Sequence, residues 1–148
     1  MAVALDDIDR QILQELTRDG RMSMRTLAET VHVSRANAYA RVERLRSAGV
    51  IRGFQADVDP VAAGLGTSAY VTLNVQQAHW RTIRAELQAL PGVVHIGLVG
   101  GDFDVILLVR TEDNAALRRL VLDEIQSIEG ILNTRTLLVF EEPDPTHR

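Results

Sequence analysis

The chain has 148 residues, of which 46% are hydrophobic and 24% charged, so it can bury one ordinary core or two small ones and is not expected to be globally disordered. It has no cysteine, which excludes a disulfide framework, a thiol nucleophile and a cysteine-type zinc site. No apolar run approaches the roughly 20 residues of a membrane span, and residues 1–7 lack the features of a signal peptide, so we expect a cytoplasmic protein.

The formal net charge is −4, but the charges are unevenly distributed along the chain. Residues 1–57 carry nine Arg and eight acidic residues, a net charge of +1, whereas residues 58–148 carry seven Arg and twelve acidic residues, a net charge of −5. Within residues 34–52, five Arg accompany a single acidic residue, Glu43. An acidic protein with one small basic segment avoids indiscriminate phosphate binding and can still dock on a DNA duplex.

A first helix is predicted from about residue 7 to residue 19. Asp6 precedes it as a cap, and Asp9, three residues further on, completes a carboxylate version of the capping box. Gly20 is expected to end the helix. The apolar residues recur at helical spacing, at Ile8, Ile12, Leu13 and Leu16.

Two further helices are predicted, each beginning after a serine. Ser23 caps a short helix, and Ser34 caps a third helix that runs to about Ser47. A tight turn containing His32 joins them, and Gly49 follows the third helix. Three short helices of which the last two are joined by a tight turn form a helix-turn-helix.

The third helix carries the side chains that a DNA recognition helix needs. Its apolar residues face the core, at Ala38, Val42 and Leu45. Arg and Asn side chains can contact base edges, Arg and Tyr can bind phosphates, and the amides of the first turn can face a phosphate. A solvated arginine-rich helix face is the alternative interpretation. We expect the DNA-binding residues to be Ser34, Arg35, Asn37, Tyr39, Arg41 and Arg44, together with Arg52 from the following segment.

Residues 50–58 are predicted to form a short strand pair, the wing of a winged helix, from which Arg52 contacts the DNA backbone. Pro60, Gly64 and Gly66 then mark a linker. The expected organisation is a DNA-binding domain of residues 1–57, a linker of residues 58–66, a second domain of residues 67–142 and a loose tail of residues 143–148.

The second domain alternates between the hydrophobic periods of strands and helices. Strands are predicted near residues 69–75, 94–98, 103–109 and 136–140, and helices near residues 80–90 and 117–128. The order β-α-β-β-α-β is that of a ferredoxin-like domain, so the chain is predicted to be an α+β protein.

Two helices cover one face of such a sheet. Burial of the other face against a second copy predicts a homodimer, and two recognition helices predict a roughly palindromic double-stranded DNA site.

The turn at residues 100–104 is a candidate ligand-binding loop. Gly100 and Gly101 permit positive φ and close approach, and their amides can face a carboxylate. Asp102 or Asp104 can accept hydrogen bonds from an ammonium group, and an amino acid carries both of these charges. Ordinary hairpin turn chemistry explains the same residues without a ligand.

These features together resemble the Lrp/AsnC family of leucine-responsive and asparagine-responsive (feast/famine) transcription regulators. The resemblance covers nearly the whole chain and rests on residues 5–13 (LDDIDRQIL), 27–29 (LAE), 33–34 (VS), 41–45 (RVERL), 49–51 (GVI) and 59–66. It implies a sequence-specific DNA-binding regulator, modulated by an amino acid or related small metabolite at a subunit interface, with dimers that often assemble into octamers.

The resemblance also implies positions for the effector site. The family's Gly-Asp-aromatic-Asp motif matches Gly101, Asp102, Phe103 and Asp104, and its last-strand threonines match Thr134 and Thr136. Gly100 stands where the family often has Thr. The expected effector-binding residues are Gly100, Gly101, Asp102, Asp104, Thr134 and Thr136.

Two other functions stay open at this stage. An architectural protein would bend or wrap DNA without an effector. Proteins similar to this family also act as haem-precursor decarboxylases. That role needs a tetrapyrrole pocket with basic and histidine residues, for which His95 and Arg110 are the nearby candidates on the predicted strands of the second domain. We expect no enzyme activity, no catalytic residue, no cofactor and no metal site, because no nucleophile has a catalytic context and the four histidines lack metal-ligand spacing.

Overall fold

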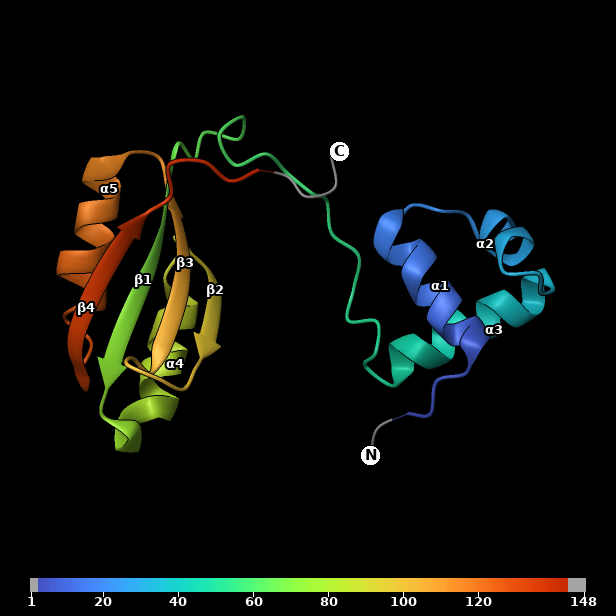
Figure 1. Cartoon of the computed structure of the whole chain (residues 1–148), viewed down its shortest axis with the longest axis horizontal. Coiled ribbons are helices and arrows are strands. Elements are labelled where there is room, and N and C mark those ends of the chain that lie inside the picture. Colours follow the sequence, from blue (N-terminus) through green and yellow to red (C-terminus); the bar gives the residue numbers. More distant parts are fainter. Residues whose placement is uncertain (1–2, 144–148) are drawn as a thin grey trace. The chain divides into compact units, whose positions relative to one another are not determined.

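The computed structural model describes residues 3–143, so residues 144–148 of the predicted tail lie outside the described residues. The chain divides into two compact units, Met1–Asp57 and Val58–Arg148, each with its own hydrophobic core (Figure 1). Within residues 3–143, no helix is both long enough and apolar enough to cross a membrane.

The first unit consists of three helices, α1 (Asp7–Arg18), α2 (Met24–Thr30) and α3 (Arg35–Ser47). Each begins after a side chain that accepts a hydrogen bond from a backbone amide three residues further on. These caps are Asp6, Ser23 and Ser34, as predicted. Asp9 accepts the reciprocal bond from the Asp6 amide, so the predicted capping box is confirmed. His32 lies in the turn between α2 and α3 with a φ of 58°, in the left-handed region.

All three helices of the first unit contribute to its core. The buried apolar residues are Ile12 and Leu16 on α1, Leu27 and Val31 at α2, and Val42 and Leu45 on α3. Ala38 is also fully buried, so the predicted inward face of α3 is confirmed. Each large apolar side chain removed from water stabilises the fold by about 1.5–3 kcal/mol. The helix-turn-helix prediction is therefore correct in its elements, its caps and its core.

The predicted strand pair at residues 50–58 is wrong. Residues 52–59 have no regular secondary structure and are exposed. A two-stranded hairpin that no further strand extends is at best marginally stable in water. Its contacts are made with the helices instead. Ile51 packs on the helical core, and the ring of Phe54 lies beside Gly20.

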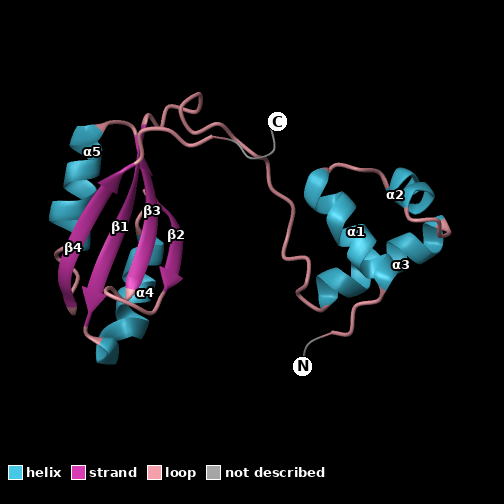
Figure 2. Cartoon of the chain, in the orientation of Figure 1, coloured by secondary structure: helices cyan, strands magenta, loops and turns pink. Residues whose placement is uncertain are grey.

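The second unit is a four-stranded antiparallel sheet with its helices on one face (Figure 2). The strands are β1 (Thr67–Val75), β2 (Val93–Leu98), β3 (Val105–Thr111) and β4 (Ile131–Leu138), in the spatial order β2-β3-β1-β4. A short turn η1 (Gln77–His79) precedes α4 (Trp80–Ala89), and the π-helical segment η2 (Leu120–Ile125) continues α5 (Asn114–Arg119). The predicted ferredoxin-like arrangement is confirmed.

The last strand begins five residues earlier than predicted, at Ile131 instead of residue 136. It is an edge strand, and most of its side chains are exposed in the single chain. A strand that buries neither face has no apolar alternation, so its polar first half gave no signal in the sequence.

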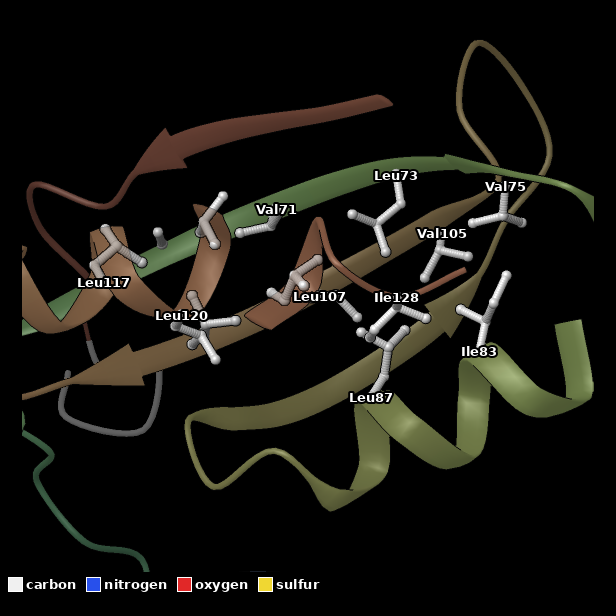
Figure 3. Packing of buried hydrophobic residues seen from close by; sticks show 14 residues of the cluster. Val71, Leu73, Val75, Ile83, Leu87, Val105, Leu107, Leu117, Leu120 and Ile128 are labelled. Carbon is white, nitrogen blue, oxygen red and sulfur yellow. The ribbon is translucent and has the colours of Figure 1, made fainter. Parts of the chain in front are cut away.

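The two faces of the sheet differ. One face packs against α4, α5 and η2, where Val71, Leu73, Val105, Leu107, Ile83, Leu87, Leu117 and Leu120 point into a common core (Figure 3). The other face carries Tyr70, Leu108 and Leu137, which are cross-strand neighbours in the sheet register. Tyr70 and Leu137 are 38% and 49% exposed, so apolar side chains lie on a face that the single chain leaves uncovered.

Gly130 lies immediately before β4 in a conformation that excludes a side chain. Its φ is 94°, and an added Cβ would lie 2.9 Å from the Cβ and Nδ1 atoms of His79 and 3.0 Å from the Cδ1 atom of Ile83. We expect Gly130→Ala to lower the free energy of unfolding of the second unit by about 2 kcal/mol, through left-handed strain and this overlap. Denaturant unfolding followed by the fluorescence of Trp80, the single tryptophan, measures this change.

The matched control for this prediction is Gly100→Ala. An added Cβ at Gly100 meets no atom within 4 Å, and its φ lies outside the left-handed region. The control is expected to unfold like the wild type. Equal midpoints for the two alanine variants would contradict the prediction.

Candidate nucleic-acid interface and effector loop

Helix α3 presents an exposed face on the side opposite its buried residues. At about 3.6 residues per turn, Ala36 and Ala40 lie at the centre of this face, with Asn37 on one side and Tyr39 on the other. All four are exposed, and Tyr39 is 58% exposed. Small side chains at the centre allow a helix to approach the floor of a groove, where flanking amide and phenol groups can contact bases or phosphates.

Arg41 is held by the first helix and does not project freely from this face. Its Nη1 donates to both carboxylate oxygens of Asp6, at 2.9 and 2.7 Å, and to Oδ1 of Asp9 at 2.8 Å. Its Nε donates to Oδ1 of Asn37 at 2.8 Å. The side chain of Arg41 is only 21% exposed. Arg41 therefore links the capping residues of α1 to an exposed amide on α3.

Asp9 is the buried centre of this arrangement, with its side chain only 1% exposed. Its Oδ2 accepts from Nη2 of Arg44 at 2.5 Å and from the amide of Asp6 at 3.1 Å. Burial raises the pKa of Asp9, but the hydrogen bonds from Arg44, the Asp6 amide and Arg41 outweigh burial and lower it to about 2. The Asp9 amide and Arg41 also lower the pKa of Asp6. Both carboxylates are therefore charged at neutral pH and balance the two arginines.

The basic segment identified in the sequence is thus largely neutralised by the fold. Arg41 and Arg44 pair with Asp6 and Asp9, and Arg46 lies 3.3 Å from a carboxylate oxygen of Glu43. Among the residues that the structure describes, Arg35 and Arg52 form no ion pair and are exposed. These two carry the uncompensated positive charge of this segment.

The other predicted DNA-binding residues lie at the start of α3 or after its end. The Ser34 hydroxyl accepts from the Asn37 amide at 3.1 Å, so it caps the helix. Arg35 follows in the first turn, and Arg52 lies in the irregular segment beyond α3. The contacts of Asp6 and Asp9 with α3 were not predicted, because the spacing of these two residues indicates only a capping box at the start of α1.

The candidate effector loop connects β2 to β3 and is fixed to the end of β1. The Val75 amide donates to Oδ2 of Asp104 at 2.9 Å, and Nδ2 of Asn74 donates to the Asp102 carbonyl at 3.0 Å. The sequence permits positive φ at both glycines of the loop, and the structure has it at Gly101, with a φ of 132°, but not at Gly100. Gly100, Gly101 and the Asp102 side chain are exposed, whereas Asp104 is half-buried. Asp104 therefore orders the loop, and Asp102 is the carboxylate that the loop presents to solvent.

The predicted effector threonines lie on β4, on the other side of β1. Thr134 is paired with Leu73, whose carbonyl also accepts from the Asp104 amide at 2.9 Å. The structure therefore brings Thr134 and the loop to the same end of β1, and Thr136 lies two residues further along the strand. Nε2 of Gln126 donates to Oγ1 of Thr134 at 2.8 Å. Gln126, which follows η2, was not singled out in the sequence.

Arg110 and His95 are the basic residues considered for a haem-precursor decarboxylase. Arg110 donates to both carboxylate oxygens of Glu142, at 2.9 and 3.1 Å, and its side chain is 18% exposed. His95 is exposed on β2. In the described part of the chain, no three His, Asp or Glu side chains are grouped so that they can hold a metal ion.

Two family models match the chain. An AsnC-type helix-turn-helix domain matches residues 5–46, and an Lrp/AsnC ligand binding domain matches residues 68–148. The chain belongs to the Lrp/AsnC family of transcription regulators. The family match confirms the resemblance identified in the sequence and the order of the two domains.

Individual members of the Lrp/AsnC family are similar over nearly the whole chain. The HTH-type transcriptional regulator AldR of Mycolicibacterium smegmatis is 37% identical, over 93% of this chain and 82% of the relative. The structure of E. coli AsnC is 28% identical with a TM-score of 0.85 and covers 96% of both chains. A Neisseria meningitidis transcriptional regulator, solved as a complex with L-Met, is 26% identical with a TM-score of 0.87 and covers 95% of this chain and 93% of its own.

The acidic centre of the first unit predicts a specific loss of stability at low pH. Asp9 has a folded pKa of about 2 against an ordinary value of 3.8. A carboxyl group whose pKa is lowered by folding contributes stability above its unfolded pKa and loses it as the pH falls through the folded pKa. The first unit is therefore expected to lose stability between about pH 4 and pH 2.

Asp9→Asn tests this source of acid sensitivity. It is expected to lower the free energy of unfolding at pH 7 by about 2 kcal/mol, because Arg41 and Arg44 lose a buried charged partner. Below pH 4, the free energy of unfolding of the variant is expected to change less with pH than that of the wild type. Far-UV circular dichroism of thermal unfolding at several pH values measures both effects. Asp7→Asn, at a 95% exposed side chain, is the control and keeps the wild-type pH profile. An Asp9→Asn profile parallel to that of the wild type would show that the acid sensitivity arises elsewhere.

Proposed function

We propose that the protein is a cytoplasmic, dimeric regulator that binds a roughly palindromic operator through α3 and is modulated by an amino acid or related metabolite bound beside residues 100–104. The observation that carries the proposal is the exposed face of α3 on a fully capped helix-turn-helix, in the same chain as the Lrp/AsnC ligand binding domain. The proposed role requires binding equilibria and no catalysed reaction.

The proposed DNA contacts follow from exposure and charge. Arg35, in the first turn of α3, and Arg52, beyond its end, are exposed and form no ion pair in the described chain, which suits phosphate contacts. Asn37 and Tyr39 flank the centre of α3 and suit base or backbone contacts. Arg44 is 44% exposed while one of its nitrogens pairs with Asp9, so it can contact DNA and remain anchored. Ser34 contributes the N-terminus of the helix, where free amides suit a phosphate.

A second copy of the chain is the proposed partner of the uncovered sheet face. Tyr70, Leu108 and Leu137 form part of an apolar surface there. A two-fold axis through a dimer would repeat α3 at half-sites about one helical turn apart or at a multiple of it. Assembly of dimers into octamers stays a prediction of the family resemblance, and analytical ultracentrifugation measures it.

An amino acid suits the chemistry of the loop. Gly100 and Gly101 allow a ligand to approach backbone amides, which suit a carboxylate, and Asp102 offers a free carboxylate to an ammonium group. The similar Neisseria meningitidis regulator in complex with L-Met supports an amino acid as the ligand class. The loop is exposed in the single chain, so atoms of a second subunit are proposed to complete the site. Thr134 and Thr136 are proposed to border it.

The DNA contact of Arg35 is testable by substitution. Arg35→Ala is expected to weaken binding to any duplex by about tenfold and to reduce the slope of log K against log salt by about 0.9 per subunit, because a phosphate contact is lost. Fluorescence anisotropy at several salt concentrations measures both quantities. Arg118→Ala, which removes the same charge from an exposed site on α5, is the control. Equal effects of the two variants would assign the change to overall charge.

The effector site is testable with free amino acids. A thermal-shift screen of the twenty amino acids, with L-methionine first, is expected to find at least one that raises the melting temperature by several degrees. Asp102→Ala is expected to abolish this shift and to preserve DNA binding without ligand. Glu112→Ala, also at an exposed acidic residue of the second unit, is the control.

The same screen separates the proposal from an architectural role. A shift that persists in Asp102→Ala would place the effector elsewhere. DNA binding that no amino acid alters would favour the architectural function.

A further inference from the structure

The contacts among Asp6, Asp9, Arg41 and Arg44 bring together residues that are 32 to 35 positions apart in the chain. These four residues form what we call the acidic clamp. Two carboxylates of α1 accept four hydrogen bonds from two guanidinium groups of α3. With Ala4 and Ala40, the clamp lines a hollow of about 390 Å³. This arrangement deepens the proposed function, on which the inference rests, because it acts on the helix proposed to contact DNA.

The two carboxylates of the clamp have different surroundings. Asp9 is buried, and both of its oxygens accept hydrogen bonds, so releasing Arg41 and Arg44 would leave an unpaired buried charge. Asp6 is 54% exposed, and both of its oxygens accept from Arg41. The Asp6 carboxylate therefore occupies Nη1 of Arg41, one of the nitrogens with which an arginine binds a phosphate.

The clamp also reaches the exposed face of α3. Nε of Arg41 donates to Oδ1 of Asn37, so the Asn37 amide is oriented by an arginine that is itself fixed. Its Nδ2 group is left as a donor at the exposed face and suits an acceptor such as N7 of a purine. A chain of contacts thus runs from the cap of α1 through Arg41 to a side chain proposed to contact bases.

We propose that the acidic clamp is an internal substitute for DNA phosphate, which withholds Arg41 from non-specific backbone contacts and positions Asn37 for a base. Phosphate contacts supply affinity for every duplex alike, whereas base contacts distinguish one sequence from another. An arginine that is held by carboxylates adds little to the affinity for duplexes in general and supports the base contacts that distinguish one sequence from another. Asp6, Asp9 and Arg41 are therefore positioning residues that set the ratio of specific to non-specific binding.

Asp6→Asn tests the clamp without removing the helix cap, because Asn caps helices as well as Asp. Asp7→Asn is the matched control, since it makes the same charge change at the next residue. Within residues 3–143, the Asp7 carboxylate pairs with Arg10 alone, at 3.0 Å. The DNA probes are a duplex selected by the wild-type protein from a random pool and a scrambled duplex of equal length. Thermal unfolding verifies that both variants keep the fold.

The expected result is a loss of discrimination in Asp6→Asn alone. Its affinity for the scrambled duplex is expected to rise about fivefold, and the salt dependence to steepen by about 0.9 per subunit, because Arg41 keeps Asp9 but loses its second carboxylate partner and can contact a phosphate. Affinity for the selected duplex should rise less. Asp7→Asn should change both affinities by the same small factor. Equal ratios of specific to scrambled binding in the two variants would overturn the proposal.

A second variant tests the link to Asn37. Arg41→Lys keeps the positive charge but lacks the planar fork that bonds Asp6, Asp9 and Asn37 together. It is expected to lose the same base preference as Asn37→Ala in a repeated selection. Wild-type preference in Arg41→Lys would overturn the positioning role. A wild-type protein that selects no sequence from the pool would overturn the proposed function itself, and the clamp proposal with it.

Discussion

The buried carboxylate of Asp9 is the interaction on which the geometry of the DNA-binding unit depends. It joins the first turn of α1 to α3 through Arg41 and Arg44, while the apolar core alone joins α2 to both. A unit of this size buries few large side chains, so apolar packing leaves the relative setting of the helices weakly specified. Charge-assisted hydrogen bonds are directional, and here they set the position of α3 against α1.

The same interaction explains how an acidic protein can carry an arginine-rich helix without a strongly basic surface. The sequence has a local excess of positive charge in residues 34–52, but in the fold Arg41 and Arg44 form ion pairs with the carboxylates of Asp6 and Asp9. What remains is a sparse positive surface around Arg35 and Arg52. Such a surface binds DNA weakly unless the groove contacts also fit, which is the condition for selecting one site among many.

Sequence patterns predicted the features that depend on near neighbours. The caps Asp6, Ser23 and Ser34, the buried stripe of α3 and the β-α-β-β-α-β order all follow from spacings of two to four residues. The carboxylate partners of Arg41 could not be predicted, because they lie more than thirty residues away in the sequence and no residue spacing indicates such contacts. The strand pair predicted at residues 50–58 failed because the segment has apolar residues but pairs with no strand among residues 3–143. For the candidate effector site, the glycine conformation was predictable, whereas the anchoring of Asp104 by Val75 depends on sheet pairing.

The turn between α2 and α3 has a consequence for the mechanical behaviour of the DNA-binding unit. His32 has a φ of 58°, where a residue with a Cβ costs roughly 1 kcal/mol more than glycine. This backbone strain is confined to the short turn that sets the angle between α2 and α3. The turn is therefore expected to unfold locally more readily than the two helices. A ligand that holds both helices at once would suppress this opening, and backbone amide exchange around His32 would slow on binding even where no atom of the ligand touches the turn.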